Sequence, residues 1–244
     1  MDLLPAKTPA ALAETAASRI ADLIAARPDA AVVVATGNTP LATYRVLGER
    51  VGRGDLDASR LRVFQLDEYL GLGHGDDRSL YGWMARAFLH PLGIPERNAV
   101  RLPSGAVDPD AACRAYDAAV RDAGGFDLAI LGLGPNGHLG FNEPPSDRAA
   151  PTRVVTLSPE SVASNAAYWG GDPARVPRQA LTAGMDLLLA ARHTLLLVSG
   201  APKRAILRRA LDGPPTADVP ASWLHLAPKV TVVADRAALT DGAP

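Results

Sequence analysis

Residues 31–40 read AVVVATGNTP, and this stretch decides the fold class. Its first five residues form an uninterrupted apolar run of strand length, which is typical of a strand buried on both faces in a parallel sheet. A small polar turn follows at 36–38, and Thr39-Pro40 is typical of a helix start. The stretch therefore predicts a strand, a turn and a helix, which is the repeating unit of α/β proteins.

The same alternation continues on both sides of this stretch. Helices are expected at 9–27, 79–89, 110–122, in a segment ending at 187–191, and at 203–211. Further strands are expected at 61–66 (ending at Asp67-Glu68-Tyr69), 126–131, 194–198 and 229–234. This order predicts an α/β fold with a doubly wound, mainly parallel sheet and helices on both faces, as in Rossmann-like proteins.

The domain organisation is expected to be simple. No repeat and no low-complexity linker interrupts the chain, so residues 1–244 are expected to form a single domain. The stretch 142–178 has weak periodicity and many Pro, Gly, Ser and Asn residues. Long irregular segments in compact domains are usually functional, which predicts a lid at approximately 145–182.

Composition excludes several classes of function. The chain has 25 Lys and Arg against 26 Asp and Glu, so neither a nucleic-acid partner nor a polybasic membrane surface is expected. Cys113 is the only cysteine, which excludes an intrachain disulfide and a cysteine-based metal cluster. The first residues lack a signal-peptide pattern, and no apolar run is long enough to span a membrane. We therefore expect a cytoplasmic protein.

Two turns in the sequence are suited to bind an anion. Thr36, Gly37, Asn38 and Thr39 open a helix, where free backbone N–H groups and the helix dipole attract phosphate. The stretch 199–203 has the same strand–turn–helix form and adds Lys203. Either turn alone could be an ordinary helix cap, but two at one sheet edge favour a phosphorylated ligand. Neither matches the P-loop spacing.

The stretch 132–145, GLGPNGHLGFNEPP, combines glycines with groups that can transfer protons. It formally fits G-x-G-x-x-G, but no long helix follows, so a dinucleotide cofactor is disfavoured. Asn136, His138 and Glu143 favour acid–base chemistry, since histidine titrates near neutral pH and a carboxylate can orient its ring. The spacing of His138 and Glu143 does not match zinc sites, so neither a metal nor a cofactor is expected.

Asp67 is the candidate proton acceptor. An adjacent Asp-Glu pair such as Asp67-Glu68 is often a helix cap or a surface pair. Its expected position at the carboxyl end of a strand, where ligands bind in open parallel sheets, favours a catalytic carboxylate instead.

These segments together resemble the glucosamine-6-phosphate deaminase family, within the superfamily that also contains galactosamine-6-phosphate isomerases and 6-phosphogluconolactonases. The similarity lies in 66–69 (LDEY), 132–144 (GLGPNGHLGFNEP), 36–40 (TGNTP), 181–184 (LTAG) and Lys203, and it extends from the first helix to Asp235. The string GHLGFNEP is highly specific. The 6-phosphogluconolactonases share the fold but carry a different sequence after Gly-His.

The resemblance implies conversion of an amino-sugar 6-phosphate to fructose 6-phosphate and ammonia without metal or nucleotide. His138 would assist ring opening, oriented by Glu143 and Asn136, and Asp67 would move the C2 proton to C1. The implied substrate-binding residues are the phosphate turn, the motif glycine and the phosphate lysine: Thr36, Gly37, Asn38, Thr39, Gly137 and Lys203. A small sugar phosphate is the expected partner, and the oligomeric state is open, a homo-oligomer included.

Three departures from the family pattern bear on specificity. Ala167 stands where glucosamine-type members carry a phosphate-binding lid arginine, and we expect Arg178, rather than the more mobile Arg175, to replace it. Val155 replaces the basic residue of the family's allosteric site, and the chain stops at Pro244, before the family's allosteric C-terminal segment. We therefore expect no activation by N-acetylglucosamine 6-phosphate.

The missing lid arginine leaves the sugar epimer open. Galactosamine-6-phosphate deaminases/isomerases, which form tagatose 6-phosphate, also lack it, and they resemble this chain at 35–37 and 220–222. A 6-phosphogluconolactonase is disfavoured by 141–144 (FNEP). A non-catalytic sugar-phosphate-binding regulator is disfavoured because both Asp67 and His138 are present.

Overall fold

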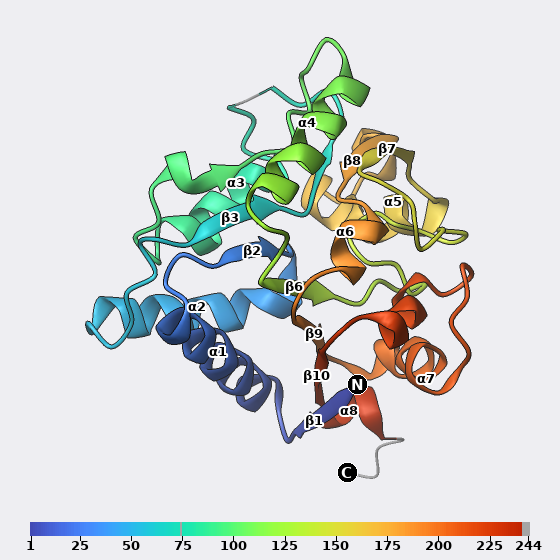
Figure 1. Cartoon of the computed structure of the whole chain (residues 1–244). Helices are drawn as coiled ribbons and strands as arrows, with labels where there is room; N and C mark the ends of the chain where they lie inside the picture. Colours follow the sequence, from blue (N-terminus) through green and yellow to red (C-terminus); the bar gives the residue numbers. More distant parts are fainter. Residues whose placement is uncertain (74, 241–244) are drawn as a thin grey trace.

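The computed structural model describes residues 1–73 and 75–240. In this part of the chain, seven parallel strands form a central sheet in the order β1-β10-β9-β6-β2-β3-β5 (Figure 1). Its strands are β1 (Asp2–Ala6), β2 (Ala31–Val34), β3 (Arg62–Gln65), β5 (Ala99–Val100), β6 (Leu128–Gly132), β9 (Thr194–Val198) and β10 (Val230–Asp235). The strand order runs in opposite directions from β2 and β6, which marks a switch point between them.

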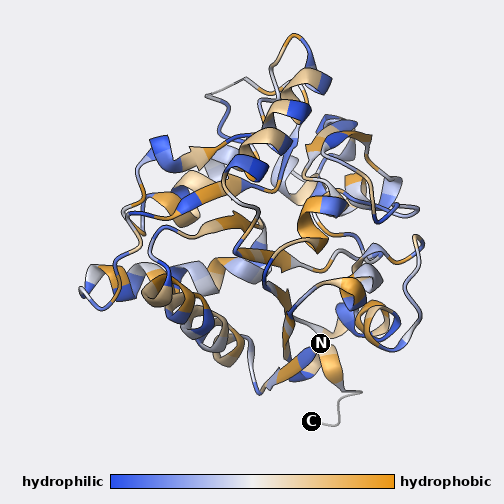
Figure 2. Cartoon of the chain, in the orientation of Figure 1, coloured by the Kyte–Doolittle hydropathy of each residue, from blue (hydrophilic) through white to orange (hydrophobic). Residues whose placement is uncertain are grey.

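The stretch 31–35 is buried on both faces, as its sequence predicts. Val32 and Val34 join a core formed with α1 (Pro9–Ala26) and α2 (Asn38–Gly52). Val33 and Ala35 join a second core formed with α4 (Pro109–Asp122), α6 (Met185–Leu189) and α7 (Arg204–Asp212). Figure 2 shows hydrophobic colour along the central strands and mixed colour on the helices. The predicted α/β fold with helices on both faces of the sheet is confirmed.

Helix starts follow from capping residues. The side chain of Thr8 accepts a hydrogen bond from the backbone N–H of Ala11 and Pro9 follows it, so α1 begins where the sequence predicts. Asp108 caps α4 in the same way. The segment 80–89, predicted as one helix, is α3 (Leu80–Met84) continued by the π-helix η1 (Ala85–Leu89).

The remaining helices are short. They are η2 (Glu96–Asn98), α5 (Pro159–Asn165), η3 (Ala166–Trp169), η4 (Pro173–Arg175), η5 (Ala201–Lys203), η6 (Pro220–Leu226) and α8 (Arg236–Leu239). No helix in residues 1–73 and 75–240 is long and apolar enough to cross a membrane.

A second, antiparallel sheet corrects two predictions. It contains β4 (Asp67–Tyr69), β8 (Gln179–Thr182) and β7 (Arg153–Thr156) in the order β4-β8-β7. The motif 67–69 is therefore a separate strand rather than the end of β3. The stretch 142–178, predicted as irregular, holds β7, α5, η3 and η4, elements too short to give a clear periodicity.

The segment 145–182, which we expect to act as a lid and call the lid segment, packs on the site side of the molecule through a small core. Tyr69 and Phe141 contribute to this core, and so do Val162, Trp169 and Ala180. Figure 1 shows α5, β7 and β8 grouped together beside the main sheet. The strand β1 was not predicted; it lies at the edge of the main sheet, where Pro5 is tolerated.

Candidate active site

A cavity of about 370 Å³ lies at the carboxyl ends of the parallel strands. The turn after β2, the loop after β6 and the turn after β9 all contribute, as expected for the switch point of an open parallel sheet. The sequence-predicted residues that line it are Thr36, Gly37, Asn38, Thr39, Asp67, His138 and Lys203. The fold thus brings most of the predicted site into one place.

The turn at 36–39 presents backbone N–H groups to the cavity. Gly37 is the N-cap of α2 with φ of 101°, a conformation that favours glycine, and no side chain caps the helix there. The helix behind it is 15 residues long, so the turn has the dipole and the free donors of an anion site. Lys203 adds a cation, and partial burial lowers the pKa of its ammonium.

The two carboxylates of the DEY motif have different environments. Glu68 is buried and accepts hydrogen bonds from the backbone N–H groups of Tyr69, Leu80 and Tyr81 and from the Gln65 side chain. These four donors hold Glu68 as a structural anion. Its role is therefore to fix the start of α3 against β4.

Asp67 is buried but lacks such support. Its Oδ1 atom has no hydrogen-bond partner within residues 1–73 and 75–240, and the residue lines the cavity. Burial, followed by the charge of Glu68, raises the pKa of Asp67 to about 7. A carboxyl group that titrates near neutral pH in a cavity is suited to accept and return a proton.

His138 stands on the loop after β6, with its ring packed over Gly134. A Cβ atom at Gly134 would overlap this ring, so glycine is required there. The Nδ1 atom of His138 lies 3.6 Å from Oε1 of Glu143. Burial, which outweighs the opposing charge of Glu143, lowers the pKa of His138 to about 4, so the imidazole is neutral at pH 7.

The other predicted motif residues shape this loop rather than the cavity. Asn136 accepts a hydrogen bond from the backbone N–H of His138 at 3.3 Å, so it orients the loop and not the ring. The carbonyl of Gly137 accepts from the backbone N–H of Ala221, and a Cβ there would lie 2.9 Å from a methyl group of Val219. Both residues therefore stabilise the loop that carries His138.

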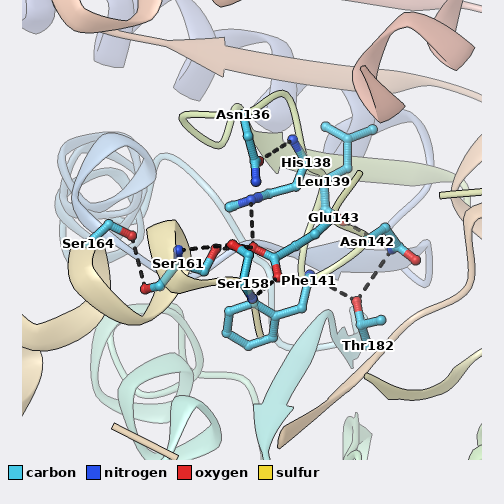
Figure 3. A network of polar contacts seen from close by, with 10 residues as sticks. All are labelled: Asn136, His138, Leu139, Phe141, Asn142, Glu143, Ser158, Ser161, Ser164 and Thr182. Carbon is cyan, nitrogen blue, oxygen red and sulfur yellow. Dashed lines mark hydrogen bonds and ion pairs between the residues drawn. The ribbon is translucent and has the colours of Figure 1, made fainter. Parts of the chain in front are cut away.

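Two serines that the sequence did not reveal hold Glu143. Its carboxylate accepts hydrogen bonds from the backbone N–H and the hydroxyl of Ser158 at 2.6 and 2.8 Å. The hydroxyl of Ser161 also donates to it. Figure 3 shows both serines directed at the carboxylate of Glu143, with the His138 ring next to it.

Besides Lys203, the positive charge of the cavity comes from a segment that no sequence pattern singled out. Arg178 is exposed and lies outside the cavity, as does Arg175, so neither is brought to the site. The loop before α3 and the η1 helix supply Arg78 and Arg86 instead. The guanidinium of Arg78 is bound by Asp76 at 2.6 and 2.8 Å.

The lid reaches the cavity through η3. The Arg78 guanidinium lies 4.7 Å from the centre of the Trp169 ring, which links the loop before α3 to the lid. Tyr168, next to Ala167, lines the cavity, and its hydroxyl is the nearest atom to the open side of Gly37. No pattern in the sequence marks these residues, because their approach to the cavity depends on tertiary structure.

No metal centre is evident. In the described ranges, no group of three or more His, Cys, Asp and Glu side chains is placed to hold a metal ion.

Comparison with known proteins agrees with this geometry. A family model described as glucosamine-6-phosphate isomerases/6-phosphogluconolactonase matches residues 5–233. A glucosamine-6-phosphate deaminase of Streptomyces coelicolor is 43% identical over 226 residues, which cover 92% of this chain and 86% of that protein. Glucosamine-6-phosphate deaminase 2 of Bacillus subtilis is 38% identical, with 96% of this chain and 95% of that protein covered.

Solved structures give the same result. A monomeric glucosamine-6-phosphate deaminase matches with a TM-score of 0.94 and 38% identity, covering 98% of both chains. The 6-phosphogluconolactonase of Trypanosoma brucei, at a TM-score of 0.75 and 21% identity over 97% of this chain and 96% of that one, shares the fold. The chain belongs to the glucosamine-6-phosphate isomerase/6-phosphogluconolactonase family.

Proposed function

We propose that this protein is an enzyme that converts glucosamine 6-phosphate and water to fructose 6-phosphate and ammonia. The observation that carries the proposal is one cavity that joins a buried carboxyl group of pKa about 7, a neutral imidazole and a phosphate turn with a lysine. The named relatives at 38–43% identity, all glucosamine-6-phosphate deaminases, support it.

Phosphate binding would fix the substrate at one end. The N–H groups of 36–39 and the Lys203 ammonium would hold the 6-phosphate, and Arg78 and Arg86 would add positive charge at the cavity wall. Positioning by the phosphate leaves C1 and C2 of the sugar near the loop after β6 and near Asp67. This is a proximity effect, in which a remote group orients the reacting atoms.

Ring opening would be the first chemical step. The neutral His138 takes the proton of the C1 hydroxyl group, the C1–O5 bond breaks as the C1 carbonyl forms, and His138 returns the proton to O5. Glu143 stabilises the imidazolium that forms for a short time beside it. The product is the open-chain amino aldehyde.

Proton transfer between carbon atoms would follow. Asp67 removes the proton from C2 while the C1 carbonyl oxygen takes up a proton from water, which gives an enolamine with a C1–C2 double bond and a C1 hydroxyl group. Asp67 then returns its proton to C1, and the nitrogen becomes doubly bonded to C2 as an iminium group. Water adds to C2, and ammonia leaves as the C2 carbonyl forms and a proton returns to the solvent. One carboxyl group thus serves as base and then as acid, for which a pKa near 7 is suited.

A second candidate substrate is galactosamine 6-phosphate, which would give tagatose 6-phosphate. The observation that favours it is Ala167, which occupies the lid position where the family resemblance implies an arginine in glucosamine-type enzymes. Its neighbour Tyr168 lines the cavity in place of a cation.

The test is ammonia release from the two amino-sugar 6-phosphates, measured side by side, with 6-phosphogluconolactone hydrolysis as the competing assay. We expect ammonia from glucosamine 6-phosphate with the higher kcat/KM. A higher kcat/KM on the galactosamine epimer would select the second candidate. Lactone hydrolysis without ammonia release from either amino sugar would contradict the proposed function.

A further inference from the structure

The lid and the motif loop meet at one carboxylate. Glu143 follows the loop of His138 in sequence, whereas the groups that bind it belong to the N-terminus of α5. Its Oε2 atom accepts from the Ser158 N–H, and its Oε1 atom accepts from two hydroxyl groups, those of Ser158 and Ser161. The same Oε1 atom faces Nδ1 of His138 at 3.6 Å, beyond hydrogen-bond distance (Figure 3).

The arrangement leaves the ring without a partner on that side. Nδ1 of His138 is buried and has no hydrogen-bond partner in the described part of the chain. Glu143 would be the natural acceptor, but its near oxygen is already engaged by Ser158 and Ser161. Ser161 is itself fully buried, so its hydroxyl group has no solvent to compete for it.

We infer that Ser158 and Ser161 are positioning residues, which act through Glu143 to hold its carboxylate beside His138 without letting it bind the ring. This inference rests on the proposed function, since it assigns a role to the base of the ring-opening step. Hydrogen bonds from hydroxyl groups spread the charge of the carboxylate, which weakens its stabilisation of a positive charge on the imidazole ring. The imidazole stays neutral and ready to accept a proton at its other nitrogen.

The other charged groups near the ring act in a known direction. Lys203 on η5 opposes a proton on His138, as burial does, and only Glu143 favours one. Asp67 on β4 lines the same cavity. Removing one donor from Glu143 therefore leaves more uncompensated negative charge beside the ring, and its proton affinity must increase.

The same contacts connect the lid to catalysis. Ser158 is the N-cap of α5, and its hydroxyl also accepts from the backbone N–H of Ser161. A displacement of α5 would withdraw three donors from Glu143 at once. His138 would then respond to the position of the lid, although its Nδ1 atom has no hydrogen bond to the lid within the described residues.

The experiment is an NMR titration of the His138 ring in the ligand-free protein, with the signal assigned by its loss in His138→Gln. In Ser161→Ala we expect the titration midpoint to move upward by about one pH unit, roughly a tenfold gain in proton affinity. Ser161→Thr keeps the hydroxyl group and should restore the wild-type midpoint. In a Glu143→Gln background, Ser161→Ala should cause no shift.

Kinetics give a second reading. With hexosamine 6-phosphate, Ser161→Ala should leave KM nearly unchanged, because the serine does not touch substrate, and should move the far acid limb of the kcat profile, which His138 sets, upward by about one pH unit. An unchanged midpoint in Ser161→Ala, or the same shift in the Glu143→Gln background, would overturn the inference.

The inference can be tested even if Ser161→Ala does not fold or if the protein shows no turnover. If Ser161→Ala does not fold, Ser161→Cys, whose thiol is a weaker donor, carries the test with a smaller upward shift. The titration needs no turnover. A wild-type protein without deaminase activity but with the expected shifts would refute the proposed function while the positioning role stands.

Discussion

The replacement of Asp67 by Asn should remove catalysis while the protein still folds. Asn has the same shape as Asp but cannot accept the C2 proton, so kcat on hexosamine 6-phosphate should fall by about 100- to 10,000-fold. Asp67 and the 36–39 turn line the same cavity, and the Oδ1 atom of Asp67 has no partner to lose within residues 1–73 and 75–240. KM, which reports mainly on the phosphate contacts, should therefore change little.

The pH dependence follows from the raised pKa of Asp67. The ionised carboxylate is the active form, so activity should be complete above pH 7 and should fall about tenfold per pH unit below it. His138, whose pKa is lowered to about 4, should affect only the far acid side of the profile. The limb near pH 7 thus belongs to the aspartate and not to the histidine.

The stability of the folded protein should change with pH in the direction opposite to activity, so it should fall as pH rises. The pKa of Asp67 is about 7 in the folded protein against 3.8 for the ordinary group, so the native state binds the extra proton between these values. Wild-type stability should therefore fall as pH rises from about 4 to about 7, by on the order of 4 kcal/mol in all. Asp67→Asn removes this penalty, and its stability relative to wild type should increase over the same interval.

The assays are ammonia release over pH 5–9 and the melting temperature at pH 4 and pH 8. We expect the Asn variant to melt at a higher temperature than wild type at pH 8 and to lose that advantage at pH 4. The reasoning is refuted if Asp67→Asn keeps more than about a tenth of the wild-type kcat. It is equally refuted if the variant is less stable than wild type at pH 8.

Three further predictions concern the cavity wall, the motif loop and regulation. Arg78→Ala and Arg86→Ala should each raise KM for hexosamine 6-phosphate about tenfold, because each removes positive charge near the phosphate. Arg178 is exposed, so Arg178→Ala should leave KM unchanged. Equal effects of all three substitutions on KM would contradict this prediction. Gly134→Ala should displace the His138 ring and lower kcat at least tenfold. The control is Gly132→Ala, whose Cβ meets no atom within 4 Å in the described chain and which should lower kcat less. Similar losses of kcat in both variants would contradict the steric argument. Initial rates should stay hyperbolic with or without N-acetylglucosamine 6-phosphate, because Val155 offers no charge where the family's allosteric site carries a basic residue. A sigmoidal curve altered by that compound would argue against this.

Five inner strands of the central sheet, β2, β3, β6, β9 and β10, could be predicted because burial leaves a direct trace in the sequence. An apolar run such as 31–35 is readable as a strand buried on both faces, and the two cores on either side of β2 confirm it. The rule that ligands bind beyond the carboxyl ends of parallel strands then brought Asp67, His138 and Lys203 to one edge. These inferences need only local pattern and topology.

The different roles of the neighbouring carboxylates Asp67 and Glu68 could not be predicted from local sequence pattern and topology. Asp67 and Glu68 are adjacent and chemically alike, and either could be a base. Four hydrogen-bond donors, from Gln65 and from residues up to 13 positions after Glu68, hold Glu68 as a structural anion. The difference lies in which groups donate to each carboxylate, and donors are assembled only by the folded chain.

Arg178 is a second case in which the sequence did not predict which side chains reach the cavity. The expectation for Arg178 rested on its position next to 179–182, where the family resemblance resumes. However, β8 pairs with β7 and β4 and leaves Arg178, the residue just before the strand, on the surface. Arg78, from a loop a hundred residues earlier, instead meets the lid at Trp169. Charge near a ligand is set by which segments cross over the cavity. A lid that lacks its own arginine can therefore keep a cationic wall, provided that it packs against a loop that carries one.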